Sequence, residues 1–206
     1  MARVLVACEF SGVVREAFRE LGHTAYSCDL LPAEDGSKHH YQCDVRELIG
    51  WSNSWDLMIA HPPCTYLAVS GIHWNNRIPG RAALTEEALQ FVRELLDAKI
   101  PYIALENPVG VISTHIRKPD QYIQPWQFGH PFSKKTGLWL RNLPKLTPTE
   151  VLEPTAFQTN GSPRWENQTA SGQNKLTPSP DRWALRSITY TGIANAMAAQ
   201  WGSLLD

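Results

Sequence analysis

The chain has 206 residues, of which 43% are apolar and 19% are charged, so it can bury a core as one domain. Its 19 basic and 20 acidic residues give a net charge of -1, which excludes a uniformly basic protein that coats nucleic acid. No apolar run approaches the roughly 18 residues that cross a bilayer, and the four cysteines form no Cys-x-x-Cys pair. We therefore expect a cytoplasmic protein with no membrane span, no disulfide framework and no metal site.

The first third of the chain alternates between strand and helix patterns. Residues Arg3 to Cys8 form a short apolar run typical of a buried parallel strand. Apolar residues then repeat at helical spacing from Val13 to Leu21, and Gly22 is a suitable helix end. In this pattern Arg15 lies on the polar face of the helix. His23 to Cys28 predicts a second strand, and Tyr41 to Val45 a third, short one.

The same alternation continues up to residue 107. Trp55 to Ala60 predicts a fourth strand, which the double proline Pro62-Pro63 must end. Thr85 is a candidate N-cap for a long helix with apolar residues at helical spacing up to Leu96. Pro101 to Glu106 predicts a fifth strand. Strands and helices that alternate over short connections indicate βαβ units, and hence an α/β fold with a mostly parallel sheet and helices on both faces.

The pattern changes after Asn107. Residues 141-186 are rich in Pro, Thr, Ser, Asn and Gln, which predicts loops or short irregular strands, and a helical stripe from Ile193 to Trp201 predicts a terminal helix. We therefore expect a main domain of residues 1-140 and 187-206 with a small insertion at 141-186. Residues 111-147 carry six basic side chains and one acidic one, so they could neutralise phosphates if the fold gathers them, although a solvated loop fits as well.

Polar side chains follow each predicted strand, at the edge where ligands of open α/β sheets bind. Pro-Pro-Cys is the most specific of these groups, because two prolines hold a thiol at a fixed place. A carboxylate such as Glu106, at the end of an apolar strand, is costly without a partner. The groups are Glu9-Phe10-Ser11-Gly12, Asp29, Cys43-Asp44-Val45, Pro62-Pro63-Cys64 and Glu106-Asn107-Pro108.

Taken together and in this order, these groups resemble the motifs of the DNA cytosine C5-methyltransferase family. The resemblance covers most of residues 3-140 and suggests a short, phage-like member. It implies a Rossmann-like fold that binds S-adenosylmethionine (SAM), or a modified SAM, as cofactor. The implied SAM contacts are Glu9, Phe10, Ser11, Gly12, Asp29, Asp44, Pro63 and Asn195.

The resemblance also implies a mechanism, because C5 of cytosine is a poor nucleophile until a group adds to C6. Cys64 would attack C6 while Glu106 binds the N3 and amino edge, and C5 would then accept the methyl group. The partner would be DNA, with the cytosine flipped from the duplex or single-stranded. His61 could lower the pKa of the neighbouring thiol or merely cap the strand. Further substrate contacts are expected from Pro62, Asn107, Lys134, Lys135 and Arg141.

The sequence departs from the family in its short insertion, which leaves little room for target recognition. Phe157, Trp165 and Trp183 of this insertion could stack on bases or form a satellite core. The same chemistry on a free pyrimidine nucleotide, single-stranded DNA or RNA is therefore an alternative, as is a catalytically silent protein that binds SAM or DNA. The thiol argues against an exocyclic amino methyltransferase, and the incomplete glycine motif against a dinucleotide oxidoreductase.

Overall fold

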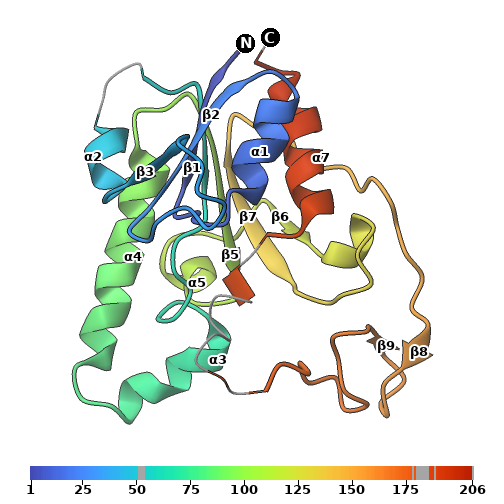
Figure 1. The fold of residues 1–206 in the computed structure, drawn as a ribbon. Helices are drawn as coiled ribbons and strands as arrows, with labels where there is room; N and C mark the ends of the chain where they lie inside the picture. The colour runs from blue at the N-terminus through green and yellow to red at the C-terminus, as the bar shows by residue number, and fades with distance from the viewer. Residues whose placement is uncertain (51–53, 178, 180–185, 188, 206) are drawn as a thin grey trace.

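A seven-stranded sheet forms the centre of the molecule (Figure 1). The computed structural model describes residues 1-50, 54-177, 179, 186-187 and 189-205. The strand order is β3-β2-β1-β4-β5-β7-β6; the first five strands in this order are parallel, and β7 runs antiparallel to both β5 and β6. The strands are β1 (Arg3–Ala7), β2 (Thr24–Asp29), β3 (His40–Gln42), β4 (Leu57–Ala60), β5 (Tyr102–Pro108), β6 (Gln121–Ile123) and β7 (Thr136–Arg141).

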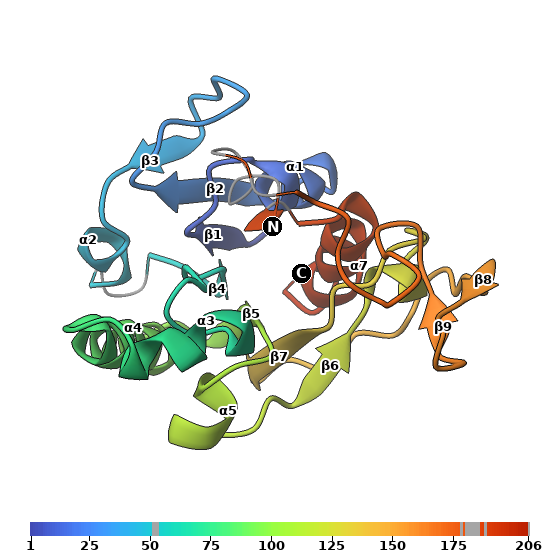
Figure 2. The ribbon, with the colours of Figure 1, turned by 90° about the horizontal axis from the view of Figure 1, so that it is seen from below.

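Helices cover both faces of the sheet, as Figure 2 shows. The helices α1 (Val13–Glu20) and α7 (Thr191–Gly202) pack together on one face, and the long α4 (Arg81–Asp97) lies on the other. Short turns of helix connect the strands: α2 (Arg46–Ile49), α3 (Val69–Ile72), η1 (His73–Asn76), α5 (Ile112–His115) and η2 (Pro125–Gln127). The α/β class predicted from the sequence, a mostly parallel sheet between two helical layers, is confirmed.

Alternate residues of the central strands feed two separate cores. Val4 and Val6 of β1 face α1 and α7, where they pack with Phe18 and Trp201. Leu5 and Ala7 point the other way, into the core under α4. This alternation is what a strand buried on both faces requires.

The helix expected to begin at Thr85 begins four residues earlier, so the prediction of Thr85 as its N-cap is wrong. Thr85 is buried within α4, and its hydroxyl donates to the Tyr66 carbonyl at 3.2 Å. The turn at Gly80, with φ of 80°, starts the helix instead. The third strand is also shorter than expected, since β3 ends at Gln42.

The placement of Arg15 differs from the sequence pattern as well. Arg15 is fully buried, although its spacing put it on the polar face of α1. The loop after β2 folds back over the start of α1, so that Asp35 pairs with the guanidinium and Ser27 accepts a hydrogen bond at 2.8 Å. A buried guanidinium needs such partners to offset its desolvation.

The irregular segment after β7 is attached by specific contacts to the segment between β6 and β7. It contains a two-stranded ribbon of β8 (Ala156–Phe157) and β9 (Pro163–Arg164). Asn167 exchanges two hydrogen bonds with the backbone of Ser133, at 2.9 and 2.8 Å. Trp165 stacks on Trp126 with the ring centroids 5.3 Å apart. Within the described residues, no helix is both long and apolar enough to span a membrane.

Candidate active site

The parallel strands end along one edge of the sheet, and the polar groups that follow them gather there. The strand order reverses between β1 and β4, which lie side by side, so the loops after these two strands open a crevice. Glu9 lies two residues after the end of β1, and His61 directly follows β4. Because β7 is antiparallel, its first residues also reach this edge, where Thr136 pairs with Pro108.

The loop that carries Cys64 is held by its neighbours on both sides. The His61 N–H donates to the Ala7 carbonyl at 2.9 Å, which ties the start of the loop to β1. The buried Asn107 side chain donates to the Pro62 carbonyl at 2.7 Å, which ties the loop to the end of β5. After the thiol, the N–H groups of Leu67 and Ala68 both donate to the Cys64 carbonyl. The nucleophile candidate therefore sits on a short, braced turn.

The Cys64 thiol lies within electrostatic reach of several charged groups. Burial raises its pKa above the ordinary value, and Glu106 raises it further, while the positive charges of Arg186 and Lys134 partly oppose this rise. The thiol is therefore protonated at neutral pH in the free protein, and a nucleophilic role requires it to lose this proton when a substrate binds.

The Glu106 carboxylate is ionised in spite of its burial. Burial alone would raise the pKa of Glu106, but a hydrogen bond from His61, the charge of Lys134 and the Thr136 hydroxyl outweigh it, so the net pKa lies below the ordinary value. The His61 Nδ1 lies 2.8 Å from Oε2 of Glu106. A carboxylate with these partners can bind a group that presents hydrogen-bond donors.

A small cavity of about 10 Å³ adjoins Glu106 and lies between β7 and the start of α7. Lys134 and Tyr190 form part of its wall, and the Lys134 ammonium donates to the Arg186 carbonyl at 2.9 Å. The cavity has room for about one water molecule, so a pyrimidine ring enters only if side chains of its wall move.

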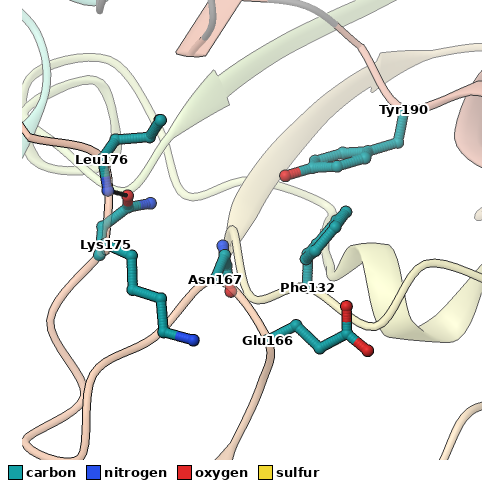
Figure 3. Close-up of a pocket in the computed structure, with 7 residues that line it drawn as sticks. Phe132, Glu166, Asn167, Lys175, Leu176 and Tyr190 are labelled. Carbon is teal, nitrogen blue, oxygen red and sulfur yellow. Dashed lines mark hydrogen bonds between the residues drawn. The ribbon is translucent and has the colours of Figure 1, made fainter.

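A larger cavity of about 320 Å³ also has Tyr190 in its wall (Figure 3). The Tyr190 and Phe132 rings lie side by side on one wall, 5.6 Å apart, and Lys175 stands across from them. The opposite wall belongs to the irregular segment, which the bonds of Asn167 to Ser133 hold in place. Tyr190 therefore lines both the Glu106 cavity and a wider, aromatic-lined space.

A third cavity, of about 160 Å³, lies at the ends of β1, β2 and β3. Asp29, Asp44 and Pro63, which the sequence proposes for the cofactor, all contribute to its wall. Asp29 accepts a hydrogen bond from the Leu31 N–H with one oxygen, and Asp44 pairs with Arg46. Two carboxylates beside an apolar wall suit the hydroxyls and the ring of an adenosine, so the residues present fit the adenosine half of SAM.

The loop after β1 is arranged differently from a glycine-rich phosphate or cofactor loop. The Glu9 carboxylate is buried and accepts hydrogen bonds from the N–H groups of Val14 and Arg15, at 2.7 and 3.2 Å. Burial raises the pKa of Glu9, which these two bonds and His61 partly oppose. Glu9 thus caps helix α1. A Cβ at Gly12 would meet the Arg15 guanidinium, and Gly12 has φ of 76°, so this position requires glycine. The Val13 N–H donates to the Ser11 hydroxyl at 3.5 Å, and the roles of Phe10 and Ser11 toward a cofactor stay predictions.

Three predicted site residues lie apart from these cavities. Arg141 ends β7 opposite Ile103, at the other edge of the sheet, and donates to the Ala98 carbonyl at 2.7 Å. Its place in an antiparallel strand, which the sequence did not reveal, puts it away from Cys64 and Glu106, and its predicted contact with substrate stays a prediction. Lys135 is exposed and lies 4.4 Å from the Tyr122 ring, while Asn195 is exposed on α7.

The structure adds residues to the site that the sequence pattern did not single out. Thr136 and Tyr190 reach it only because β7 and α7 approach the end of β5, a long-range arrangement with no local signal. Of the predicted aromatic residues, Trp165 is buried against Trp126, whereas Phe157 is exposed. Trp183 lies outside the described residues. No group of three His, Cys, Asp or Glu side chains in the described part of the chain is placed to hold a metal ion.

Comparison with known proteins finds similarity only at the level of solved structures. No protein-family model matches the sequence, and a comparison with curated proteins finds no match. One similar structure is a protein described as a DNA modification methyltransferase encoded within a prophage of E. coli, with a TM-score of 0.47 and 15% identity. Another is the Dnmt2 methyltransferase of S. pombe, with a TM-score of 0.44 and 17% identity.

These two similarities are partial. The alignments cover 77% and 70% of this chain, and 57% and 51% of the two solved chains. The chain therefore spans little more than half the length of either protein.

Proposed function

We propose that this protein transfers a methyl or related group from SAM to C5 of cytosine in DNA, through a covalent bond between Cys64 and C6. The observation that carries the proposal is that one loop, Pro62-Pro63-Cys64, borders both the candidate cofactor cavity and the surroundings of Glu106. Pro63 forms part of the wall of the cavity that fits adenosine, and the next residue, Cys64, lies within electrostatic reach of Glu106 and Lys134. Methyl transfer requires the methyl donor beside C5 and the thiol beside C6 of the same ring, so the cofactor cavity and the thiol must adjoin each other.

In this mechanism the protein residues handle the pyrimidine. The Glu106 carboxylate accepts a hydrogen bond from the exocyclic amino group of the ring, and the Cys64 thiolate adds to C6, which makes C5 nucleophilic. The proton that the thiol gives up reaches N3 by way of Glu106 and returns by the same route when the thiolate leaves. SAM, when bound, supplies an electrophilic methyl group on a sulfonium sulfur, which C5 can accept. A base, such as water, then removes the C5 proton, and the electron pair of the broken C–H bond restores the C5–C6 double bond and expels the Cys64 thiolate.

Two features explain how Cys64 becomes reactive only with a substrate present. Burial keeps the free thiol protonated, which protects it from side reactions. Lys134 and Arg186 act in the opposite direction, so a substrate that brings these cations closer to the sulfur favours the thiolate. We infer that Lys134 moves toward Cys64 when the pyrimidine displaces it from the Glu106 cavity.

The cavity beyond Tyr190 favours a polynucleotide over a free nucleotide as the substrate. It adjoins the Glu106 cavity, and its Tyr190 and Phe132 rings offer a surface on which a neighbouring base can stack. Lys175 provides a cation for a phosphate. A free pyrimidine nucleotide has no second base to use this space.

Mass spectrometry of nucleosides tests the proposal directly. DNA and deoxycytidine monophosphate are incubated together with the protein and SAM, and the wild type is compared with Cys64→Ala. A modified cytosine in DNA that requires Cys64 supports the proposal, whereas modification of the nucleotide alone supports the second substrate class. If neither is modified although SAM binds, the protein is a silent binder or uses another donor.

A covalent-trapping experiment separates an enzyme from a silent binder. A single-stranded oligonucleotide with 5-fluorocytosine lacks the C5 proton whose loss releases the enzyme, so a turnover leaves the protein bound. The proposal predicts a denaturation-resistant complex with the wild type and none with Cys64→Ala. The absence of a complex in both would contradict the covalent mechanism.

A further inference from the structure

His61 is fixed in the sheet edge between β4 and the two prolines. Its N–H donates to the Ala7 carbonyl at 2.9 Å, so its backbone is tied to the central strand β1. Its side chain is 9% exposed, and that of Glu106 is 13% exposed. The imidazole and the carboxylate therefore interact largely away from water, where their interaction is stronger than on a surface.

The bond between the two side chains orients the carboxylate. The His61 Nδ1 lies 2.8 Å from Oε2 of Glu106, within the range of a charge-assisted hydrogen bond. This contact engages one carboxylate oxygen and so restricts the rotation of the whole group. A carboxylate that recognises the flat edge of a base needs such a restriction.

A second carboxylate acts on the imidazole from another side. Glu9 is close enough that His61 lowers the pKa of this buried carboxyl, against the larger effect of burial. Both oxygens of Glu9 are bonded to the first N–H groups of α1. The His61 Nε2 is buried and has no hydrogen-bond partner among the described residues. His61 thus lies between the Glu9 carboxylate, which caps α1, and the Glu106 carboxylate, which adjoins the Glu106 cavity.

We propose that His61 is a positioning residue that holds the Glu106 carboxylate oriented and ionised for the pyrimidine. The inference rests on the proposed function, in which the Glu106 carboxylate accepts a hydrogen bond from the amino group of the cytosine and passes a proton to N3. The physical reason is the cost of a buried charge, since a buried carboxylate without a partner takes up a proton or turns toward solvent. Other charged groups near Glu106 are Lys134, which favours the carboxylate, and the Cys64 thiol.

Replacement of His61 should therefore change the titration of Glu106 in a defined direction. Without the imidazole, Lys134 and Thr136 still lower the pKa of Glu106. The hydrogen bond from His61, which opposes the effect of burial most strongly, is lost. The pKa of Glu106 is then expected to rise from below its ordinary value toward or above it. Asparagine at residue 61 can donate one hydrogen bond but carries no charge, so His61→Asn should give a smaller rise than His61→Leu.

The experiment measures the ¹³C signal of the Glu106 side-chain carboxyl by NMR as a function of pH. The signal is assigned by its loss in Glu106→Gln. His115→Leu is the matched control, because it removes an exposed histidine on α5. We expect an unchanged titration in this control, a clear upward shift in His61→Leu and a partial shift in His61→Asn. Thermal unfolding and SAM binding establish that each variant is folded.

The activity of the same variants provides the second measurement. We expect His61→Leu to lower kcat for cytosine modification by about 10²-fold, the order of loss that a misplaced reacting group causes. His61→Asn should recover most of that loss. An unshifted Glu106 titration in folded His61→Leu would overturn the inference, as would a shifted titration with unchanged kcat. If the Glu106 titration shifts in His61→Leu but the wild type modifies no cytosine, the proposed function is refuted while the interaction between His61 and Glu106 is retained.

Discussion

The bond between Asn107 and the nucleophile loop can be tested by a single substitution. Asn107→Ala removes the amide that donates to the Pro62 carbonyl at 2.7 Å, inside a region where Asn107 is 1% exposed. An unpaired buried carbonyl costs about 1–3 kcal/mol. The Asn107 Oδ1 is itself buried without a partner among the described residues, so its removal offsets part of this loss. We therefore expect the free energy of unfolding to fall by about 1–2 kcal/mol.

For a domain of this size, each kcal/mol changes the melting temperature by about 2–4 °C, so Asn107→Ala should melt roughly 2–8 °C lower. The loop should also lose its fixed position, and covalent trapping of a 5-fluorocytosine oligonucleotide should slow by about tenfold or more. Differential scanning calorimetry and a timed trapping assay on denaturing gels measure the two effects separately.

Gln121→Ala is a suitable control for this experiment. The Gln121 amide donates to the Leu146 carbonyl at 2.7 Å and accepts from the Leu146 N–H at 2.8 Å, so the substitution removes a bond of the same kind, and one more, on β6, away from the Cys64 loop. It should lower the melting temperature without slowing the trapping. If Asn107→Ala melts lower but traps at the wild-type rate, the bond only stabilises the fold, and our account of the loop is wrong.

Three further predictions concern the same edge of the sheet. In Gly110→Ala, the new Cβ would lie 1.9 Å from the Leu67 carbonyl oxygen, so both the melting temperature and the trapping rate should fall; a neutral result would contradict the packing. Because burial raises the pKa of Cys64, iodoacetamide should alkylate it appreciably only above the pH at which free cysteine reacts, and Lys134→Met should slow that reaction near neutral pH. Asp29→Asn and Asp44→Asn should weaken SAM binding in calorimetry, whereas Asp56→Asn, beside Arg3 at the opposite edge, should not.

The sequence predicts most of the parallel half of this fold because that half depends on local patterns. An apolar run of the right length, such as Trp55 to Ala60, specifies a buried strand, and the prolines after it specify where the strand ends. Polar residues after such strands must lie at one edge, whichever order the strands take. This is why Asp29, Asp44 and Pro63 could be expected to lie close together, and they line one cavity.

The antiparallel part could not be predicted in the same way. The strand β7 is recognisable as a strand only through its pairing with β5, over thirty residues away, and a glycine interrupts its apolar pattern at residue 137. Its direction decides which of its residues face the site. Lys134, before the strand, reaches the Glu106 cavity, and Arg141, at its end, binds the carbonyls that end α4.

Arg15 illustrates a second limit of sequence patterns. A helical period assigns charged residues to water, and this holds for Glu20 of the same helix. The pattern contains no information on the loop that closes over Arg15, which supplies Asp35 as a counter-ion. Local periodicity thus predicts the helix, while the burial of one of its charges depends on a distant segment.

In the proposed mechanism, the rigidity of the loop that carries Cys64 determines where movement must occur when a pyrimidine binds. Pro62 and Pro63 restrict the backbone dihedrals of the loop, and bonds to Ala7 and Asn107 fix it on two sides. The Glu106 cavity is nevertheless too small for a pyrimidine. The opening must therefore come from the opposite wall, where Lys134 and Tyr190 can change rotamer without breaking any strand pairing. Such movement would open the Glu106 cavity toward the one lined by Phe132, so a polynucleotide could enter both cavities at once.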